Sequence, residues 1–217
     1  MPTSRMRALA LVWCWLFAIG CDSASDRLIA QLQDGDPKTR RAAARALGER
    51  SDGAEPVVAA LGSACHDPDA GVRECAAVAL GSLKAASVAS LPVLDTLLDD
   101  PESSVRIAAA LAIQKIDPRH ESYVAVLTDA LKAGHGPVFL EVGQMGAGAE
   151  WAVPMLVTKL SDPRASIRAL AARTLGKIGV ADSKTKSALK RSLRDDRPAV
   201  RKAAQHALEQ IQGKNRG

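Results

Sequence analysis

Apolar residues recur every three or four positions along most of the chain, which is the spacing of amphipathic helices. Val72, Ala76 and Leu80, for example, would share one face of a helix. The stretches 91–98 and 154–160 show similar apolar spacing, and each is followed closely by an Asp-Pro dipeptide. Proline has a fixed φ and no N–H to donate, so it ends a helix and favours a turn. The pattern predicts pairs of helices joined by tight turns.

These helix pairs belong to an internal repeat with a period of about 33 residues. The clearest copies are DPDAGVRECAAVALG at 67–81, DPESSVRIAAALAIQ at 100–114 and DPRASIRALAARTLG at 162–176. Further copies begin at Asp34 and, less closely, at Asp195. One helix pair cannot bury its apolar faces alone, so the repeats must stack. We predict an all-α solenoid of about six helix–turn–helix units over residues 26–212, followed by a flexible tail at 213–217.

Two charged positions persist through the repeat, an aspartate in the turn and an arginine six residues later. The aspartates are Asp34, Asp67, Asp100, Asp162 and Asp195, and the arginines are Arg40, Arg73, Arg106, Arg168 and Arg201. The fourth copy departs from this rule, because no proline follows Asp129 and His135 stands where the arginine is expected. Two glycines and Pro137 surround this histidine. This segment is either a decayed repeat with a loosened turn or a hinge or binding loop.

The Asp-Pro turn, the Val-Arg step and the Ala-Leu-Gly ending resemble the short HEAT repeats of the phycobiliprotein-lyase-like class. The resemblance covers about residues 26–212. It implies that each turn aspartate caps the second helix of its unit and pairs with arginines of adjacent units, as a structural ladder along the solenoid. The class contains scaffolds, bilin lyases, iron hydroxylases and DNA glycosylases, so the resemblance is specific for the fold and not for an activity.

Residues that could carry enzyme chemistry are scattered. The four histidines fall in different units, whereas the iron hydroxylases of this class use repeated His-Glu pairs, of which only His120-Glu121 occurs here. Aromatic residues make up 3% of the chain and nothing marks a chromophore pocket. The sequence has no glycine-rich phosphate loop, triad signature or metal-spaced cysteine set. We expect no catalytic, cofactor or metal site; the alternative is an enzyme or enzyme subunit of the bilin-lyase or iron-hydroxylase type.

The amino terminus has the features of an export signal. Arg5 and Arg7 precede an apolar run of twelve residues, 8–19, which is too short to span a bilayer of about 30 Å. The run ends in Ala-Ile-Gly-Cys, which resembles the lipobox of bacterial lipoproteins. The resemblance implies a signal peptide at 1–20, lipidation of Cys21 and a short tether at 21–25. The protein would then be exported and anchored at the periplasmic face of the inner or the outer membrane. The alternative is an ordinary signal peptide or a short membrane anchor.

The two other cysteines of the mature chain, Cys65 and Cys75, occupy predicted core positions, where cysteine acts as a small hydrophobic residue. An oxidising compartment would also permit a disulfide between them, and the sequence leaves that open. The net charge of +5 is unevenly placed, because ten Lys or Arg face three acidic residues from position 184 onward. Export argues against a nucleic-acid partner for this basic end.

A binding surface is predicted from the positions one and five residues after each repeated arginine or its equivalent, which should point to the concave side. The middle units present apolar residues there, flanked by basic ones. The predicted protein-binding face comprises Arg45, Glu74, Val78, Ile107, Leu111, Leu140 and Arg173. An uncovered apolar strip on a soluble protein usually has a use. The alternative is that curvature or a neighbouring helix covers Leu111 and Leu140. We expect the partner to be another protein or an extended peptide.

Overall fold

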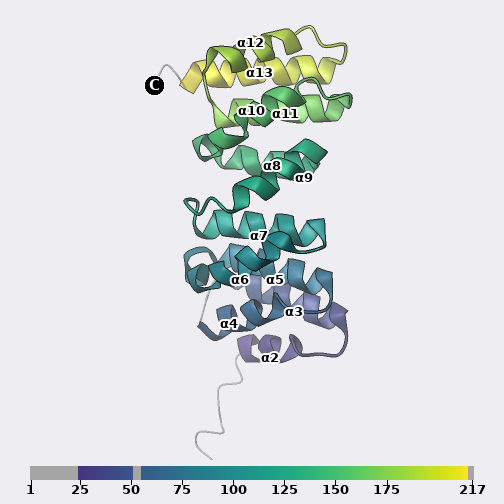
Figure 1. Cartoon of the computed structure of the whole chain (residues 1–217), viewed down its shortest axis with the longest axis vertical. Coiled ribbons are helices and arrows are strands. Elements are labelled where there is room, and N and C mark those ends of the chain that lie inside the picture. Colours follow the sequence, from purple (N-terminus) through teal and green to yellow (C-terminus); the bar gives the residue numbers. More distant parts are fainter. Residues whose placement is uncertain (1–23, 51–54, 215–217) are drawn as a thin grey trace, which may run out of the picture.

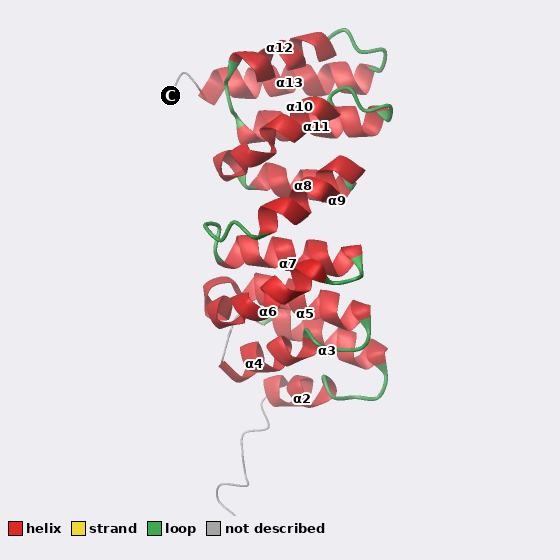
Figure 2. Ribbon diagram, in the orientation of Figure 1, coloured by secondary structure: helices red, strands yellow, loops and turns green. Residues whose placement is uncertain are grey.

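The computed structural model describes residues 24–50 and 55–214, and these form helices joined by short loops, without strands. Six helix pairs stack in one row along the long axis of the molecule (Figure 1). Figure 2 shows that loops occur only at the two ends of each helix pair. The predicted all-α solenoid is confirmed. Cys21 and the rest of the predicted signal peptide lie outside the described residues.

Each unit contributes one helix to each of two layers. The first helices are α2 (Ala24–Gln31), α4 (Glu55–Ala64), α6 (Leu91–Thr96), α8 (Tyr123–Ala133), α10 (Val153–Lys159) and α12 (Ser183–Ser192). The second helices are α3 (Pro37–Glu49), α5 (Ala70–Leu83), α7 (Ser103–Ile116), α9 (Gly136–Gln144), α11 (Ala165–Ile178) and α13 (Pro198–Lys214). Three 3₁₀ segments, η1 (Lys84–Ser90), η2 (Leu97–Asp99) and η3 (Gly146–Ala152), connect them.

The core is a continuous row of small and branched apolar side chains between the two layers. Each first helix from α4 onward completely buries a leucine at the equivalent position: Leu61, Leu94, Leu127, Leu156 and Leu189. Each second helix from α5 onward buries one β-branched residue near its start: Val72, Val105, Val138, Ile167 and Val200. Cys65 and Cys75 are buried, as predicted, and both are free thiols. Burial raises the pKa of Cys65 to about 12, because it disfavours the thiolate.

The turn aspartates fix the turn before the second helix and are not its caps. The carboxylate of Asp67 accepts a hydrogen bond from the N–H of Asp69, at 2.9 Å, and Asp100 accepts one from Glu102 at the same distance. The N-cap of α5 is Asp69 itself, whose carboxylate accepts from the N–H of Val72. In α3 and α5 the capping role implied by the resemblance therefore belongs to the residue two positions later, Asp36 or Asp69, whereas Glu102 and Arg164 at the same position of α7 and α11 make no side-chain cap. The turn aspartate stabilises an Asx turn instead.

Second helices approach one another closely where a glycine of one meets an alanine of the next. A Cβ on Gly81 of α5 would lie 2.8 Å from the Cα of Ala112 in α7. Gly48 meets Ala79 in the same way, and Gly176 meets Ala207. These contacts leave no room for a side chain, so the repeated Ala-Leu-Gly ending determines how tightly the second helices stack.

The junction between α7 and α9 lacks this contact. Gln114 stands where the other units have the glycine, and Glu141 stands where they have the small partner. The backbones of α7 and α9 are not closely packed, unlike those of α5 and α7 or of α11 and α13, and α7 packs mainly on α8 at this junction. Lys115 of α7 and Glu141 of α9 form a looser ion pair at 3.7 Å. The second-helix layer is therefore least compact between the third and fourth units.

The fourth unit is shorter by one helical turn. Leu127 follows Leu94 by 33 residues, but Leu156 follows Leu127 by 29, so Ala133 occupies the place of the turn aspartate. The missing residues lie at the start of α9, where the other second helices carry the repeated arginine. The assignment of Asp129 to the acidic position was therefore wrong, because similarity in spacing hid the deletion. Asp129 lies on the surface of α8, where Lys132 donates to it at 2.7 Å.

One described stretch, 70–99, is long and apolar enough by composition to cross a membrane. It consists of α5, η1, α6 and η2, and the chain turns at Lys84, which has a positive φ of 53°. Its helices pack against α3 and α7 within the solenoid. We therefore assign this stretch to the core of the repeat array.

Candidate functional site

At the repeated positions, three arginine–aspartate pairs join consecutive units on the side of the turns: Arg40–Asp67, Arg73–Asp100 and Arg168–Asp195. Arg73 donates from Nε and Nη2 to both carboxylate oxygens of Asp100, at 2.7 and 2.9 Å. Its Nη1 donates to the backbone carbonyls of Asp67 and Pro68 in its own turn, at 2.9 and 3.2 Å. One guanidinium thus fixes its own turn and binds the next unit through its Nε–Nη2 edge. We call these pairs the ladder.

In each ladder pair, the charge of the arginine is neutralised by that of its aspartate. The side chains of Arg73 and Asp100 are only 14% and 6% exposed. The hydrogen bond from Arg73 lowers the pKa of Asp100, and the same bond raises the pKa of Arg73. Both groups are therefore ionised at neutral pH and already matched with each other. The paired arginines have a structural role and offer no free donors to a phosphate or an acidic substrate.

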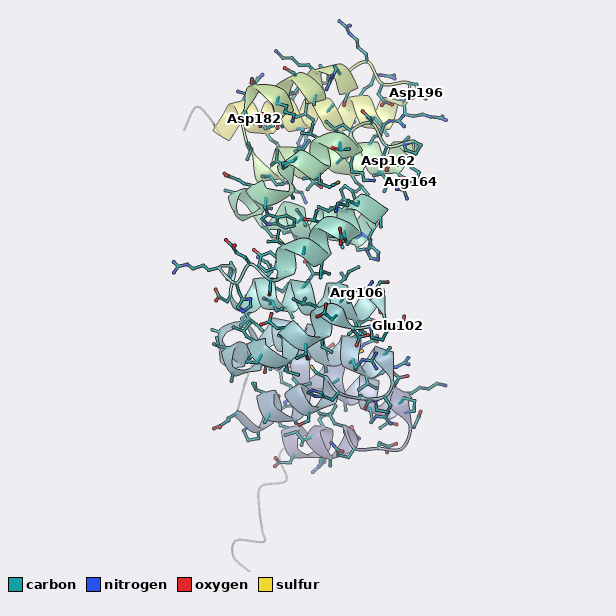
Figure 3. The ribbon with its side chains drawn as sticks, viewed as in Figure 1. Glu102, Arg106, Asp162, Arg164, Asp182 and Asp196 are labelled. Carbon is teal, nitrogen blue, oxygen red and sulfur yellow. The ribbon has the colours of Figure 1, made fainter. Side chains whose placement is uncertain are left out.

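The predicted ladder positions at the ends of the chain and at the fourth unit are not paired in this way. Asp34 belongs to the first unit, and its carboxylate accepts only the N–H of Asp36, at 2.8 Å, among the described contacts. Asp162 follows the irregular unit and binds Lys159 at 3.0 Å and Arg164 at 2.9 Å (Figure 3). These two bonds lower the pKa of Asp162. The ladder is thus interrupted wherever the neighbouring unit lacks the required arginine.

Arg106 and Arg201 retain the turn contacts without a carboxylate. Nη1 of Arg106 donates to the carbonyls of Asp100 and Pro101, at 2.6 and 2.9 Å. Within the described residues, no carboxylate lies in ion-pair contact with its guanidinium, because Ala133 replaces the aspartate of the next unit. The expectation that Arg106 pairs with a turn acid was therefore wrong. Arg201 makes the same carbonyl contacts in the last unit that the structure describes.

The predicted protein-binding face is partly open. Val78 of α5 is 52% exposed and Leu140 of α9 is 49% exposed, which is unusual for large apolar side chains in this structure. Ile107 and Leu111 of α7 are half-buried and pack against the core. Arg45 and Arg173 are exposed, and Glu74 is half-buried. The apolar strip therefore has two uncovered positions, on α5 and α9, with a partly covered stretch between them.

Two grooves on this second-helix face differ in charge. The groove between α3 and α5, of about 330 Å³, is lined by Arg45, Glu49, Glu74 and Val78 among others. The groove between α11 and α13, of about 380 Å³, is lined by Arg173, Lys177, Lys202 and His206, with no acidic residue. The second-helix face therefore carries mixed charge and an exposed valine at its amino-terminal end, and positive charge at its carboxy-terminal end.

One histidine network was not anticipated from the sequence. Ser122 Oγ donates to Asp95 at 2.8 Å and lies 2.8 Å from His120 Nδ1, whose Nε2 is 3.3 Å from Asp95. A nucleophilic serine would pass its proton to the histidine, whereas this hydroxyl is directed to the carboxylate. The network therefore ties α8 to α6. The part of the chain that the structure describes contains no group of three metal-ligating side chains.

The comparisons with known proteins address the fold. The model of HEAT repeats matches residues 25–114 and 142–209, and the unmatched stretch between them comprises the end of α7, α8 and most of α9. No curated protein matches the sequence. An engineered protein is 22% identical, with a TM-score of 0.60, over 88% of this chain and 97% of its own. A designed armadillo repeat protein in complex with the peptide (KR)4 is 18% identical, with a TM-score of 0.61, over 87% of this chain and 100% of its own.

A natural structure with the same fold is the complex of CpcE and CpcF of phycocyanin lyase from Nostoc sp. PCC7120. It is 24% identical, with a TM-score of 0.58, over 89% of this chain and 79% of its own. At these identities the likeness shows the architecture alone. The family model, in contrast, covers most of the chain, and the gap between its two matched stretches falls in the unit in which the deletion has removed the repeated arginine. The chain belongs to the HEAT-repeat family.

Proposed function

We propose that this protein is a membrane-anchored scaffold that binds another protein, or an extended peptide, along its second-helix face. The observation that carries the proposal is the exposure of Val78 and Leu140, at 52% and 49%, on a face whose other large apolar residues are at least half-buried. Exposed apolar positions beside well-packed grooves are typical of protein interaction sites. A partner that covers both positions must lie across α5, α7 and α9.

The charge of the two grooves suggests an orientation for the partner. The carboxy-terminal groove, with Arg173, Lys177 and Lys202, favours an acidic segment. The amino-terminal groove combines Arg45 with Glu49 and Glu74, so it has no strong charge preference and offers Val78 as an apolar contact. Charge complementarity of this kind contributes more to specificity and association rate than to affinity. We therefore propose a partner whose acidic end lies on α11 and α13.

The proposed anchor is lipid on Cys21, which the lipobox-like sequence supports. Only Asp22 and Ser23 separate this cysteine from α2, which begins at Ala24. An extended chain spans about 3.5 Å per residue, so the first unit would lie close to the membrane surface. Attachment by several acyl chains is stable, whereas a single chain binds only marginally. The scaffold would thus present its second-helix face to partners near that membrane.

Site-specific photocrosslinking in cells tests the binding face. The crosslinking amino acid is placed at Val78, at Leu140 or, as the matched control, at Val88. Val88 is 51% exposed but lies on η1, between α5 and α6, outside the predicted binding face. We expect a discrete adduct from positions 78 and 140 and none from position 88. Equal adducts from all three positions, or none from the first two, would contradict the proposal.

A second experiment tests whether an adduct reflects specific binding of the partner or only its chance proximity. The variants Val78→Glu and Val88→Glu are each combined with the crosslinker at Leu140. Both substitutions replace exposed side chains, so both proteins should fold as the parent does. We expect Val78→Glu to remove the adduct at position 140, because binding would desolvate the new charge. The Val88→Glu protein should retain it.

A further inference from the structure

We propose that the cavity between the third and fourth units binds a carboxylate group through Arg106, and that an acidic side chain of the partner protein supplies it. The cavity has a volume of about 650 Å³ and lies between α7 and α8. Arg106, Ala133 and His135 are among the residues that line it. The site itself is inferred from the ladder geometry, and only the identity of the carrier rests on the proposed function.

The chain itself shows what the free edge of Arg106 is built to bind. In each ladder pair the guanidinium is oriented by Nη1, which donates to two carbonyls of its own turn, and Nε and Nη2 then hold both oxygens of a carboxylate. Arg106 makes the same two Nη1 contacts, at 2.6 and 2.9 Å, so its orientation is fixed in the same way. By analogy with the ladder pairs, this orientation directs its Nε–Nη2 edge toward the fourth unit, and Arg106 lines the cavity between the two units. Such a preorganised bidentate donor favours a carboxylate strongly.

The acidic residues around the cavity do not fill this position. Both oxygens of Asp100 are held by Arg73, and one also accepts the N–H of Glu102. Asp129 is 73% exposed at its side chain and is bound by Lys132. Asp99 is exposed at the rim and adds one negative charge near Arg106. Because Arg106 is one positive charge and Asp99 lies near it, the cavity suits a singly charged carboxylate better than a doubly charged phosphate.

The walls of the cavity match a side chain that carries a carboxylate on an apolar stem. Leu98, Val126 and Ala130 line it together with Arg106. Aliphatic walls would contact the methylene groups of a glutamate, while the guanidinium receives its carboxylate. The volume of about 650 Å³ exceeds that of one such side chain, so neighbouring residues of the partner segment would also enter. The site thus fits an acidic residue within an extended segment.

A titration with a small probe tests the site without the partner. The probe is the α-amide of N-acetylglutamate, added to protein labelled at its arginine Nε–H groups and followed by NMR. The neutral glutamine analogue at matched ionic strength is the control. We expect a saturable shift of the Arg106 signal with the glutamate probe only. Arg201 has the same carbonyl contacts but is not among the residues that line this cavity, so its signal should not saturate. Equal responses of Arg106 and Arg201 would overturn the proposal.

Two variants show where the probe binds. Ala133→Asp restores the missing ladder aspartate, and it should shift the Arg106 signal without probe and weaken probe binding at least tenfold. Asp129→Asn should leave the melting temperature unchanged and should not weaken binding. If Ala133→Asp binds the probe like the parent, the guanidinium edge is not the site. If Asp129→Asn changes the Arg106 signal and lowers the melting temperature, Asp129 already occupies that edge, and the proposal is wrong.

The proposed binding face and the proposed carboxylate site can be rejected independently of each other. Probe binding at Arg106 depends on the cavity alone, so the Val78→Glu protein should bind the probe as the parent does. Loss of the crosslinks at positions 78 and 140 with intact probe binding would reject the binding face and keep the carboxylate site. Intact crosslinks without probe binding would reject the carboxylate site and keep the scaffold.

Discussion

Replacing ladder arginines one at a time separates the energy of the carboxylate pair from that of the turn contacts. Arg73 and Arg106 make the same pair of hydrogen bonds to the carbonyls of their own turns. Only Arg73 also binds a carboxylate, that of Asp100. Methionine keeps much of the aliphatic stem and its packing, so Arg73→Met and Arg106→Met differ chiefly in the carboxylate pair.

The expected magnitudes follow from burial. Arg73→Met leaves the carboxylate of Asp100, which is 6% exposed, with only the N–H of Glu102 among its described partners. Breaking a buried pair costs about 3–5 kcal/mol, and the partial exposure of Arg73 places this one near the lower limit, at about 3 kcal/mol. Arg106→Met loses only carbonyl contacts, one of which is exposed, and should cost about 1 kcal/mol.

Urea denaturation followed by circular dichroism measures the free energy of unfolding of each variant, and thermal denaturation measures its melting temperature. For a domain of about 200 residues, 1 kcal/mol corresponds to about 2–4 °C, so Arg73→Met should melt about 6–12 °C below the parent. Arg106→Met should melt only a few degrees below it. Equal losses in the two variants would refute the reasoning, because they would show that the carboxylate pair adds no stability beyond the turn contacts.

Three further results are expected. Gly81→Ala should lower the free energy of unfolding by about 1–3 kcal/mol, because the new Cβ would meet the backbone of Ala112. Its control, Gly62→Ala, has open space around it in α4 and should raise the free energy of unfolding by up to about 1 kcal/mol. Thermal melts compare the two variants. Because the pKa of Asp100 is lowered in the folded protein, its ionised carboxylate stabilises the fold above the unfolded pKa of about 3.9, and this stability is lost as the pH falls through the folded pKa. The urea midpoint should therefore decrease as the pH is lowered below about 4, and it should decrease less steeply in Asp100→Asn. Cys21→Ser should release the protein from the membrane fraction or stop its processing, and continued membrane association with unchanged gel mobility would argue against lipidation.

The repeat made most of the fold predictable from the sequence. Five copies of the turn aspartate and the arginine, in phase over the chain, were enough to infer stacked helix pairs, because only stacking buries both faces of each pair. The same regularity misled in the fourth unit. Asp129 lies near the expected position of the turn aspartate, and nothing in a single sequence distinguishes a deletion before it from one after it. The buried leucines at 94, 127 and 156 restrict the deletion to the stretch 127–156, and α8, which continues uninterrupted to Ala133, places it after that residue.

Exposure on the second-helix face was harder to predict. Leu111 and Leu140 looked equivalent in the sequence, yet only Leu140 is largely exposed. The Gly–Ala contacts do not account for this difference, because Val78 lies on α5 between two such contacts and is as exposed as Leu140. Leu111 instead packs against the buried core, and that contact is visible only in the folded chain. The loosened junction itself was marked in the sequence, since Gln114 breaks the glycine series of Gly48, Gly81 and Gly176.

Several unusual features of this molecule occur together at the junction between the third and fourth units. In a solenoid, stability is approximately a sum of unit terms and interface terms between neighbours. The interface between the third and fourth units has lost both its ladder pair, at Arg106, and its Gly–Ala contact, at Gln114. Its interface term should therefore be among the smallest in the row, and the cavity and Leu140 lie at that same junction. A partner carboxylate on Arg106 would replace the lost pair, so binding there would strengthen one of the weakest contacts in the stack.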